Sequence, residues 1–425
     1  MIAGSPSKKA RGRAVPIIPA SLQAAPCRGI LMSARNAIRS LSLGLALITG
    51  AAFTSNAGAA DAVTASDDQP AADEKTDEGT PLIAIESEAE LQLDSSLGKP
   101  HTSAIYATIE PEITVNLSDT FRLFGHFVYE PVNDPIEDRF NAFHDEGLYA
   151  EELYAGVTVG HVKFALGKID PFFGIATDEA PGIYGQDFAG EYDFKGALGL
   201  STDVFLSDNT IGSGEDAAIV KEIVHVSLFT ADPSVLSRSL FTDRGQFHWE
   251  DARVGNTDMP ESFALGYEYS TKNADDDVVG PSWRLAMRRL AAHESNFPDE
   301  WDFLAAAQTA FDLGDERTLR PIAEVAYFVH EGGYMKNAAA TTLGLEFQQG
   351  DWITSFVAAG HDRFGAPGPA DYNLTASFGR VIKTETTGEF RVDAGFSNAR
   401  VDDVTTNVIG LRLHKDFSWE SESRL

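Results

Sequence analysis

Residues 372–378 read Tyr-Asn-Leu-Thr-Ala-Ser-Phe, and residues 342–348 read Thr-Leu-Gly-Leu-Glu-Phe-Gln. In both stretches every second side chain is apolar or aromatic, and the side chains between them are polar or small. This two-residue period is typical of a β-strand with one apolar face. Residues 85–93, 121–130 and 263–270 repeat it, which predicts an all-β chain.

The pattern, bounded by Gly, Asp, Asn and Pro, divides the chain from residue 83 onward into sixteen segments. These predicted strands are 83–94, 102–116, 120–130, 148–158, 162–169, 195–206, 219–230, 262–272, 281–290, 301–313, 318–331, 340–349, 352–362, 371–382, 386–399 and 404–417.

Long and short connections alternate between the predicted strands. Those after odd-numbered strands include 131–147, 170–194, 231–261 and 291–300. Those after even-numbered strands include 117–119, 159–161, 314–317, 350–351 and 383–385, with 207–218 and 273–280 as longer exceptions. A soluble β-sandwich has no reason to sort its connections in this way, whereas an outer-membrane barrel has short turns at one end and longer loops at the other. We therefore predict a transmembrane antiparallel β-barrel of about 16 strands.

Aromatic residues near the strand ends favour the same fold. On the apolar parity they are Tyr129, Tyr149, Tyr269, Trp283, Trp301, Phe311, Trp352, Tyr372 and Phe417. In a membrane barrel they would form girdles at the two interfaces, whereas the core aromatics of a soluble β protein would show no preference for strand ends.

The N-terminal region differs from the rest of the chain, because residues 1–59 carry seven basic residues and no acidic one. The apolar stretch 41–52 is followed by small residues up to Ala57 and Ala59, which is typical of a secretory signal cleaved after Ala59. Met32 precedes the basic part of this signal, so we expect translation to start there; the alternative is an unusually long leader.

The chain is thus divided into residues 1–59, an upstream extension with the signal peptide, and residues 60–82, an acidic disordered lead-in. Residues 83–417 form the predicted barrel and residues 418–425 a C-terminal tail. The single cysteine, Cys27, lies in the removed part, so we expect no disulfide.

The remaining chain is strongly acidic. Of 33 basic residues seven lie in the leader, so 26 remain against 64 acidic residues, a balance of −38. This argues against a nucleic-acid partner, since nucleic-acid binding needs basic residues against phosphate. No apolar run after the signal reaches the roughly 18 to 20 residues that a transmembrane helix needs.

The last predicted strand contains Val-Ile-Gly-Leu-Arg-Leu-His-Lys-Asp-Phe at residues 408–417, in which Ile409, Leu411, Leu413 and Phe417 share a face. With this strand and this architecture the chain resembles the Gram-negative outer-membrane porin superfamily. The four residues are similar to the C-terminal signal that the barrel-insertion machinery reads, although eight residues follow Phe417 where porins usually end. The resemblance implies an outer-membrane location, contact with lipid and lipopolysaccharide, and a homotrimer.

The third of the predicted outer loops is 170–194, and the chain enters it through Gly-Lys-Ile-Asp-Pro-Phe-Phe-Gly at residues 167–174. In porins this loop commonly folds into the lumen and narrows it, and the resemblance implies a constriction with these acids: Asp170, Asp178, Glu179, Asp187, Glu191 and Asp193. Bases on the inward parity would face them from the wall: Arg122, Lys163, Arg284, Arg288, Arg320, Arg391 and Arg412. Opposed charges across a narrow passage sort permeants by charge; alternatively, the acids solvate an ordinary surface loop.

The sequence offers little for catalysis. No two of the ten histidines are spaced as a metal-binding pair on one strand or helix, and there is no nucleotide-binding fingerprint. His225 and Ser227 share a strand face and could pair a nucleophile with a base, but a polar lumen wall explains them as well. Residues 248–251, His-Trp-Glu-Asp, could bind a cation or simply lie in a solvated loop. We expect no metal, no cofactor and no enzymatic activity.

Three functions remain open. Sixteen strands enclose an aqueous lumen, which favours a passive diffusion channel for small hydrophilic solutes or ions. A substrate-selective uptake porin for sugars, anions or siderophores is the alternative, and a barrel enzyme or adhesin is a more distant one.

Overall fold

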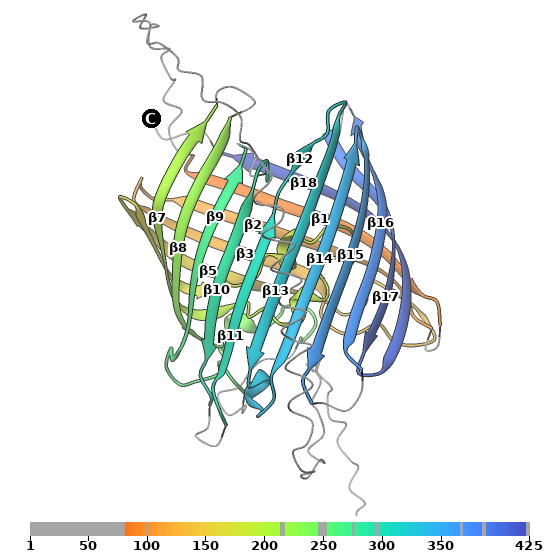
Figure 1. Cartoon of the computed structure of the whole chain (residues 1–425), viewed down its shortest axis with the longest axis horizontal. Helices are drawn as coiled ribbons and strands as arrows, with labels where there is room; N and C mark the ends of the chain where they lie inside the picture. The colour runs from red at the N-terminus through yellow and green to blue at the C-terminus, as the bar shows by residue number, and fades with distance from the viewer. Residues whose placement is uncertain are drawn as a thin grey trace, which may run out of the picture.

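The strands close into a single antiparallel barrel in the computed structural model, in which the first strand, β1, pairs with both its neighbour β2 and the last strand, β18 (Figure 1). The structure describes residues 81–98, 101–212, 217–244, 253–273, 277–293, 297–365, 369–384 and 388–421. The expected leader, with Ala57 and Ala59, lies outside the described residues, as do most of the lead-in and the His248–Asp251 stretch.

Sixteen long strands make the wall, which confirms the predicted barrel and its strand number. They are β1 (Ile83–Ser96), β2 (Ser103–Asn116), β3 (Phe121–Pro131), β5 (Glu146–Val159), β6 (Val162–Ile169), β7 (Ala197–Ile211), β8 (Ala218–Thr230), β9 (Ser262–Lys272), β10 (Ser282–Leu290), β11 (Glu300–Gln308), β13 (Arg317–Val329), β14 (Ala338–Gln349), β15 (Trp352–Arg363), β16 (Asp371–Thr384), β17 (Gly388–Val401) and β18 (Val404–Glu420).

Two short strands complete the sheet. The strand β4 (Phe140–Ala142) runs parallel to β2 within the connection from β3 to β5. The strand β12 (Phe311–Asp312) continues β11 and pairs with the same neighbour, β13. The gap between β11 and β12 lies opposite Pro321 of β13. Proline has no amide hydrogen to donate to the neighbouring strand.

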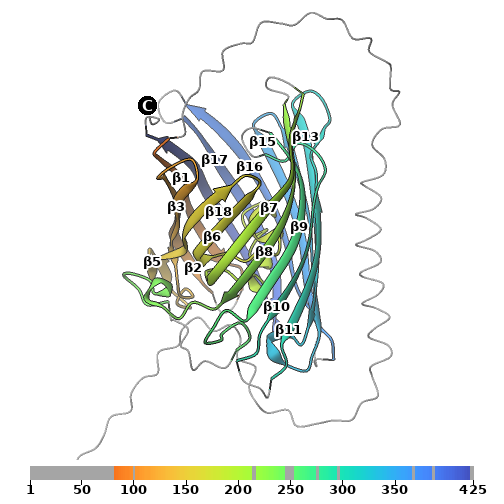
Figure 2. The same ribbon diagram turned by 90° about the vertical axis from the view of Figure 1, so that its left-hand side faces the viewer.

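The described helices are all short: α2 (Ala176–Glu179), η1 (Ala189–Glu191), η3 (Val235–Ser237) and η4 (Glu331–Gly333). None of the helices in the described residues is long and apolar enough to cross a membrane. The strands are tilted relative to the barrel axis (Figure 2), as closure of a sheet requires.

Alternate side chains of each strand face opposite sides of the barrel wall, as predicted. Leu345 and Leu374 lie on the outside and are 40% and 49% exposed, whereas Thr375, next to Leu374, is 6% exposed. Many large apolar side chains of the strands are exposed, and many polar side chains of the other parity are buried. The apolar parity therefore faces outward and the polar parity faces the lumen.

A β-bulge in β5 changes this parity at one place. His126 of β3 pairs with Glu152, but Phe127 pairs with Ala150, so Glu151 is an extra residue. Tyr149 consequently pairs with the buried Val128 and is itself 8% exposed. The predicted outward position of Tyr149 is therefore wrong. The prediction assumed a strict two-residue period, and the extra residue in the bulge shifts that period by one.

The last strand is longer than predicted. β18 extends three residues past Phe417 to Glu420, which pairs with Ala84 of β1. Of the expected C-terminal tail, Ser418 to Glu420 thus belong to the barrel wall.

Candidate functional site

The connection between β6 and β7, residues 170–196, folds inside the barrel, and we name it the inner loop. Its Phe173 and Ile175 are buried in an apolar cluster with side chains of β10, β11, β13 and β14. These wall residues are Ala286, Leu304, Ala306, Ile322, Ala326, Phe328, Ala338 and Ala340. The lumen-facing side chains of the wall are therefore apolar, and mostly alanine, where the loop contacts them.

A buried carboxylate on the wall fixes the backbone of the inner loop. Glu324 of β13 is fully buried and accepts the amide hydrogens of Ile175, at 2.6 Å, and Ala176, at 3.1 Å. The hydroxyl of Tyr192 donates to its other oxygen at 2.5 Å. One acidic side chain therefore holds the outgoing and returning halves of the loop together.

Two arginines of β10 hold the loop as well. Arg288 donates to Asp302 of β11 at 2.8 Å and to the backbone oxygen of Tyr192 at 3.0 Å. Arg284 donates to the backbone oxygen of Gly174. Both were expected to face the loop acids across an open passage; the structure instead places them against the loop, because its backbone oxygens supply the acceptors.

Glycines in the wall make room for the inner loop. A Cβ atom on Gly395 would lie 2.9 Å from the Ile183 side chain, and one on Gly344 would lie 2.9 Å from the Pro181 ring. Gly266 and Gly410 lie against Phe172 and Tyr184 of the loop in the same way. Sequence analysis missed these positions, although glycine on the lumen parity of a strand is the signal that marks a close approach.

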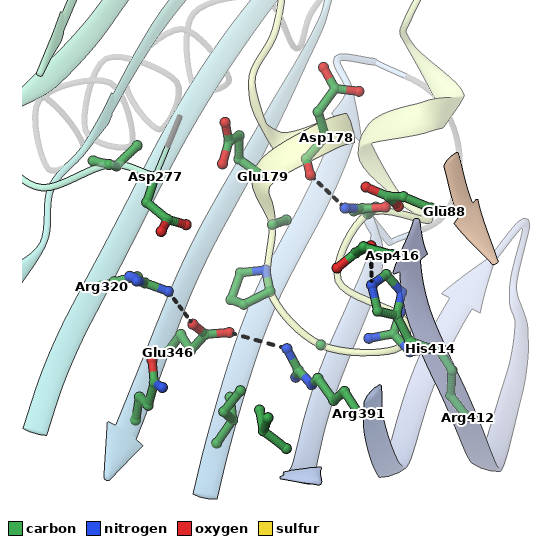
Figure 3. A pocket seen from close by; sticks show the side chains of 18 of the residues that line it. Glu88, Asp178, Glu179, Asp277, Arg320, Glu346, Arg391, Arg412, His414 and Asp416 are labelled. Atoms are coloured by element: carbon green, nitrogen blue, oxygen red, sulfur yellow. Dashed lines mark hydrogen bonds and ion pairs between the residues drawn. The ribbon is translucent and has the colours of Figure 1, made fainter. Parts of the chain in front are cut away.

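A cavity of about 980 Å³ lies between the inner loop and the wall (Figure 3). Asp178 and Glu179 border it from the loop, and Arg320, Arg391 and Arg412 border it from β13, β17 and β18. Five of the residues predicted for the constriction and the pore wall therefore share one space. It is a polar chamber in which acids from the loop and bases from the wall are both present.

The other predicted acids lie elsewhere on the inner loop. Asp170 is at its root, where its amide donates to Glu152 of β5 at 3.0 Å and its carboxylate accepts the Gly196 amide at 2.5 Å. Asp193 is half-buried and accepts the amide hydrogen of Phe194. Asp187 and Glu191 are exposed and are not among the described residues that line the cavity.

Burial and the many acidic side chains in and around the inner loop shift the pKa values of several of its titratable groups. Burial raises the pKa of Glu179 and of Asp193 above the usual range for a carboxyl group. Burial together with Glu151 and Glu152 raises the pKa of Asp170 further. Burial alone would lower the pKa of Lys195, but the surrounding carboxylates raise it well above its usual value. Those carboxylates are Glu151, Asp178, Asp193 and Asp170.

The wall bases of the cavity are paired with acids in a continuous sequence of contacts, which we name the charge chain. Figure 3 shows its two ends, from Arg320 through Glu346 to Arg391 and from His414 to Asp416. Its members in order are Arg320, Glu346, Arg391, Asp393, Arg412, Glu90, His414 and Asp416. Within it Arg391 lies 2.7 Å from Asp393, and Arg412 lies 2.8 Å from Glu90. Because every arginine of the chain has a carboxylate partner, the wall offers less free positive charge than was predicted.

The remaining two predicted bases are not among the described residues of this cavity. Arg122 of β3 lies within 3.5 Å of the Tyr154 hydroxyl, and Lys163 of β6 is paired in register with Asp203 of β7.

The wall formed by β2, β3 and β5 is acidic, which sequence analysis missed. His126 lies 3.5 Å from Glu110 and 3.4 Å from Glu151, and it is paired in register with both Glu112 and Glu152. The β-bulge allows the consecutive Glu151 and Glu152 to approach the root of the inner loop. The glutamates on the polar side of β2 could have indicated this acidic wall from the sequence. The bulge in β5 could not have been recognised from the sequence.

Ile409, Leu411, Leu413 and Phe417 share the outer face of β18, as predicted, and are each exposed. Trp419 extends this face by one further position.

His225 has an acidic partner that the sequence did not reveal. Its Nδ1 lies 2.8 Å from Asp203, and its ring stacks on Phe172 of the inner loop at 3.9 Å between centroids. No hydrogen bond joins His225 to Ser227 in the described part of the chain. This geometry supports a packing role for His225 more than a catalytic one.

No family model matches the sequence, and no curated protein matches it. Among solved structures, the chain is similar to an anion-selective porin from Comamonas acidovorans, with 9% identity, a TM-score of 0.47, and coverage of 79% of this chain and 99% of that one. It is similar to OccK2 (OpdF) of Pseudomonas aeruginosa, with 8% identity, a TM-score of 0.47, and coverage of 80% and 98%. It is also similar to the trimer form of OmpT, an outer membrane protein of Vibrio cholerae, with 10% identity, a TM-score of 0.43, and coverage of 81% and 100%. All three TM-scores lie below 0.5, and the closed barrel follows from the strand pairing of this chain itself.

Proposed function

We propose that this chain is a porin of the bacterial outer membrane, a passive channel for small hydrophilic solutes or ions, with no enzymatic activity. The observation that carries the proposal is the polar cavity inside a closed barrel whose outer face is apolar. An apolar exterior suits lipid, and a barrel with sixteen strands is wide enough for an aqueous lumen. The proposal places the long connections outside the cell and the short turns in the periplasm.

The inner loop supplies the constriction in this proposal. Asp178 and Glu179 are the two predicted acids that border the cavity, and the wall bases there are already neutralised by carboxylates of the charge chain. The wall of β2, β3 and β5 adds four glutamates. The excess of negative charge lowers the potential along the passage, so the channel should prefer cations.

Planar-bilayer recording of the purified barrel tests the channel. Stepwise openings with a reversal potential on the cation side are expected in a salt gradient. A folded barrel that gives no openings would exclude the channel and leave an adhesin or enzyme.

The substrate-selective alternative is supported by the alternating acids and bases of the charge chain, which suit a solute with groups of both signs. In that case conductance would saturate with one solute, whereas a passive channel shows no saturation.

The proposed partners follow from the surface. Lipid and lipopolysaccharide would contact the outer wall, and the barrel-insertion machinery would read Ile409, Leu411, Leu413 and Phe417. We also propose a homotrimer, and light scattering of the detergent-solubilised protein distinguishes it from a monomer.

A further inference from the structure

Closure of the barrel brings together three metal-ligating side chains from opposite ends of the chain. Glu88 of β1 is paired in register with Asp416 of β18, and Glu90 is paired with His414. One ligand atom each from Glu88, His414 and Asp416 lies within 4.8 Å of the others. All three border the cavity, and Figure 3 shows them grouped on its wall.

Both ring nitrogens of His414 lie next to carboxylates, an arrangement that is common for histidines in protein metal sites. Its Nδ1 lies 3.0 Å from Glu90 Oε1, and its Nε2 lies 2.9 Å from Asp416 Oδ1. Histidines that bind metals usually donate their second ring N–H to a carboxylate, which fixes the tautomer and orients the ring. A separation near 3 Å also suits two ligands of one ion, since each would bind at about 2.0 to 2.2 Å.

The charges around this group favour a divalent cation. Glu88, Glu90 and Asp416 are joined by Glu110 of β2, which is paired in register with Glu88. Arg412, the cation bound to Glu90, offsets one of these four carboxylates. The site is also accessible, because the Asp416 side chain is 74% exposed and the His414 side chain 20%.

We propose that Glu88, His414 and Asp416 form a binding site for a divalent transition-metal ion, with Glu90 orienting His414. One imidazole nitrogen and two carboxylate oxygens suit Zn²⁺ and its neighbours, whereas Mg²⁺ and Ca²⁺ prefer oxygen ligands alone. Three side chains leave coordination positions open to water, so the ion is exchangeable with the lumen. A bound ion would add two positive charges to the cavity wall.

Isothermal titration of the folded full-length barrel in detergent with Zn²⁺ tests the site directly. We expect one ion per chain, with affinity roughly 10- to 100-fold weaker in Glu90→Gln and a larger loss in His414→Gln, which removes a ligand. His161→Gln, in the turn between β5 and β6, is the matched control and should bind as the wild type does. Mg²⁺ in excess should not displace the Zn²⁺.

Absence of binding at millimolar Zn²⁺, or binding that His414→Gln leaves unchanged, would overturn the proposal. Asp416→Asn provides a second variant should His414→Gln fail to fold, and heat-dependent gel migration reports folding in each case.

A second readout rests on the proposed channel function. Zn²⁺ added on the side of the short turns should reduce the wild-type current and not that of His414→Gln. If titration detects the ion but no channel opens, the porin function fails and the metal site stands. Normal currents without Zn²⁺ binding would refute the metal site and leave the porin function intact.

Discussion

Removal of the Glu324 carboxylate should release the inner loop while leaving the barrel intact. In Glu324→Ala, the amides of Ile175 and Ala176 and the hydroxyl of Tyr192 lose their acceptor. An unsatisfied buried donor costs roughly 1 to 3 kcal/mol, so three cost about 3 to 9 kcal/mol before relaxation. The freed loop recovers part of this through water, and about 3 kcal/mol would still shift the balance between seated and released loop more than 100-fold.

Single-channel recording measures the result. We expect larger and noisier openings for Glu324→Ala, and passage of polymers that the wild type excludes. Glu324→Gln keeps one carbonyl acceptor and should lie between the two. Glu222→Ala is the matched control, because it removes one tyrosine hydrogen bond, to Tyr267, on the distant strand β8. Wild-type conductance and polymer cut-off in a folded Glu324→Ala barrel would refute the idea that this carboxylate seats a constricting loop.

Three further outcomes are expected. Asp178→Asn with Glu179→Gln should move the reversal potential toward anions, by an amount that shrinks at high salt as the Debye length falls; an unmoved potential at normal conductance would mean that these acids do not border the constriction. Because burial raises the pKa of Glu179, this carboxyl takes up its proton at a higher pH than an ordinary glutamate does, so wild-type cation preference should begin to decline, as the pH is lowered, before ordinary carboxyl groups titrate. Leu345→Arg, on the outer face, should destabilise the barrel by roughly 2 to 4 kcal/mol in a denaturant titration, whereas Gln348→Arg, on the lumen side of the same strand, should not; equal effects would mean that the two faces are misassigned.

The strands and their faces were predictable because each depends on neighbours in sequence. The alternation of Leu343, Leu345 and Phe347 with polar residues is a local property of the sequence. In a barrel it shows which side chains face outward and which face the lumen, even when the neighbouring strands are unknown. The inward fold of the inner loop could be predicted only from the resemblance to porins. The sequence of residues 170–196 does not reveal that Glu324 of β13 will bind the backbone of this loop.

Features that depend on register could not be predicted. The position of Tyr149 was wrong because Glu151 forms a bulge, and a bulge leaves no mark in the alternation of short segments. The group of Glu88, His414 and Asp416 depends on how β1 meets β18 after the whole sheet has closed. The glycines opposite the loop, such as Gly395, are visible in the sequence, but their partners are not.

The attachments of the inner loop have a consequence for the order of assembly. The loop leaves the wall between β6 and β7, yet its hydrogen bonds go to Glu324 of β13 and Ser377 of β16, strands that follow much later in the chain. Contacts between distant segments form late, because the entropy of closing the intervening chain must be overcome first. The loop therefore cannot be seated until β13 and β16 are in place, long after β6 and β7, which carry it, have been able to pair. An assembly arrested before the loop is seated would hold a wider passage than the finished protein.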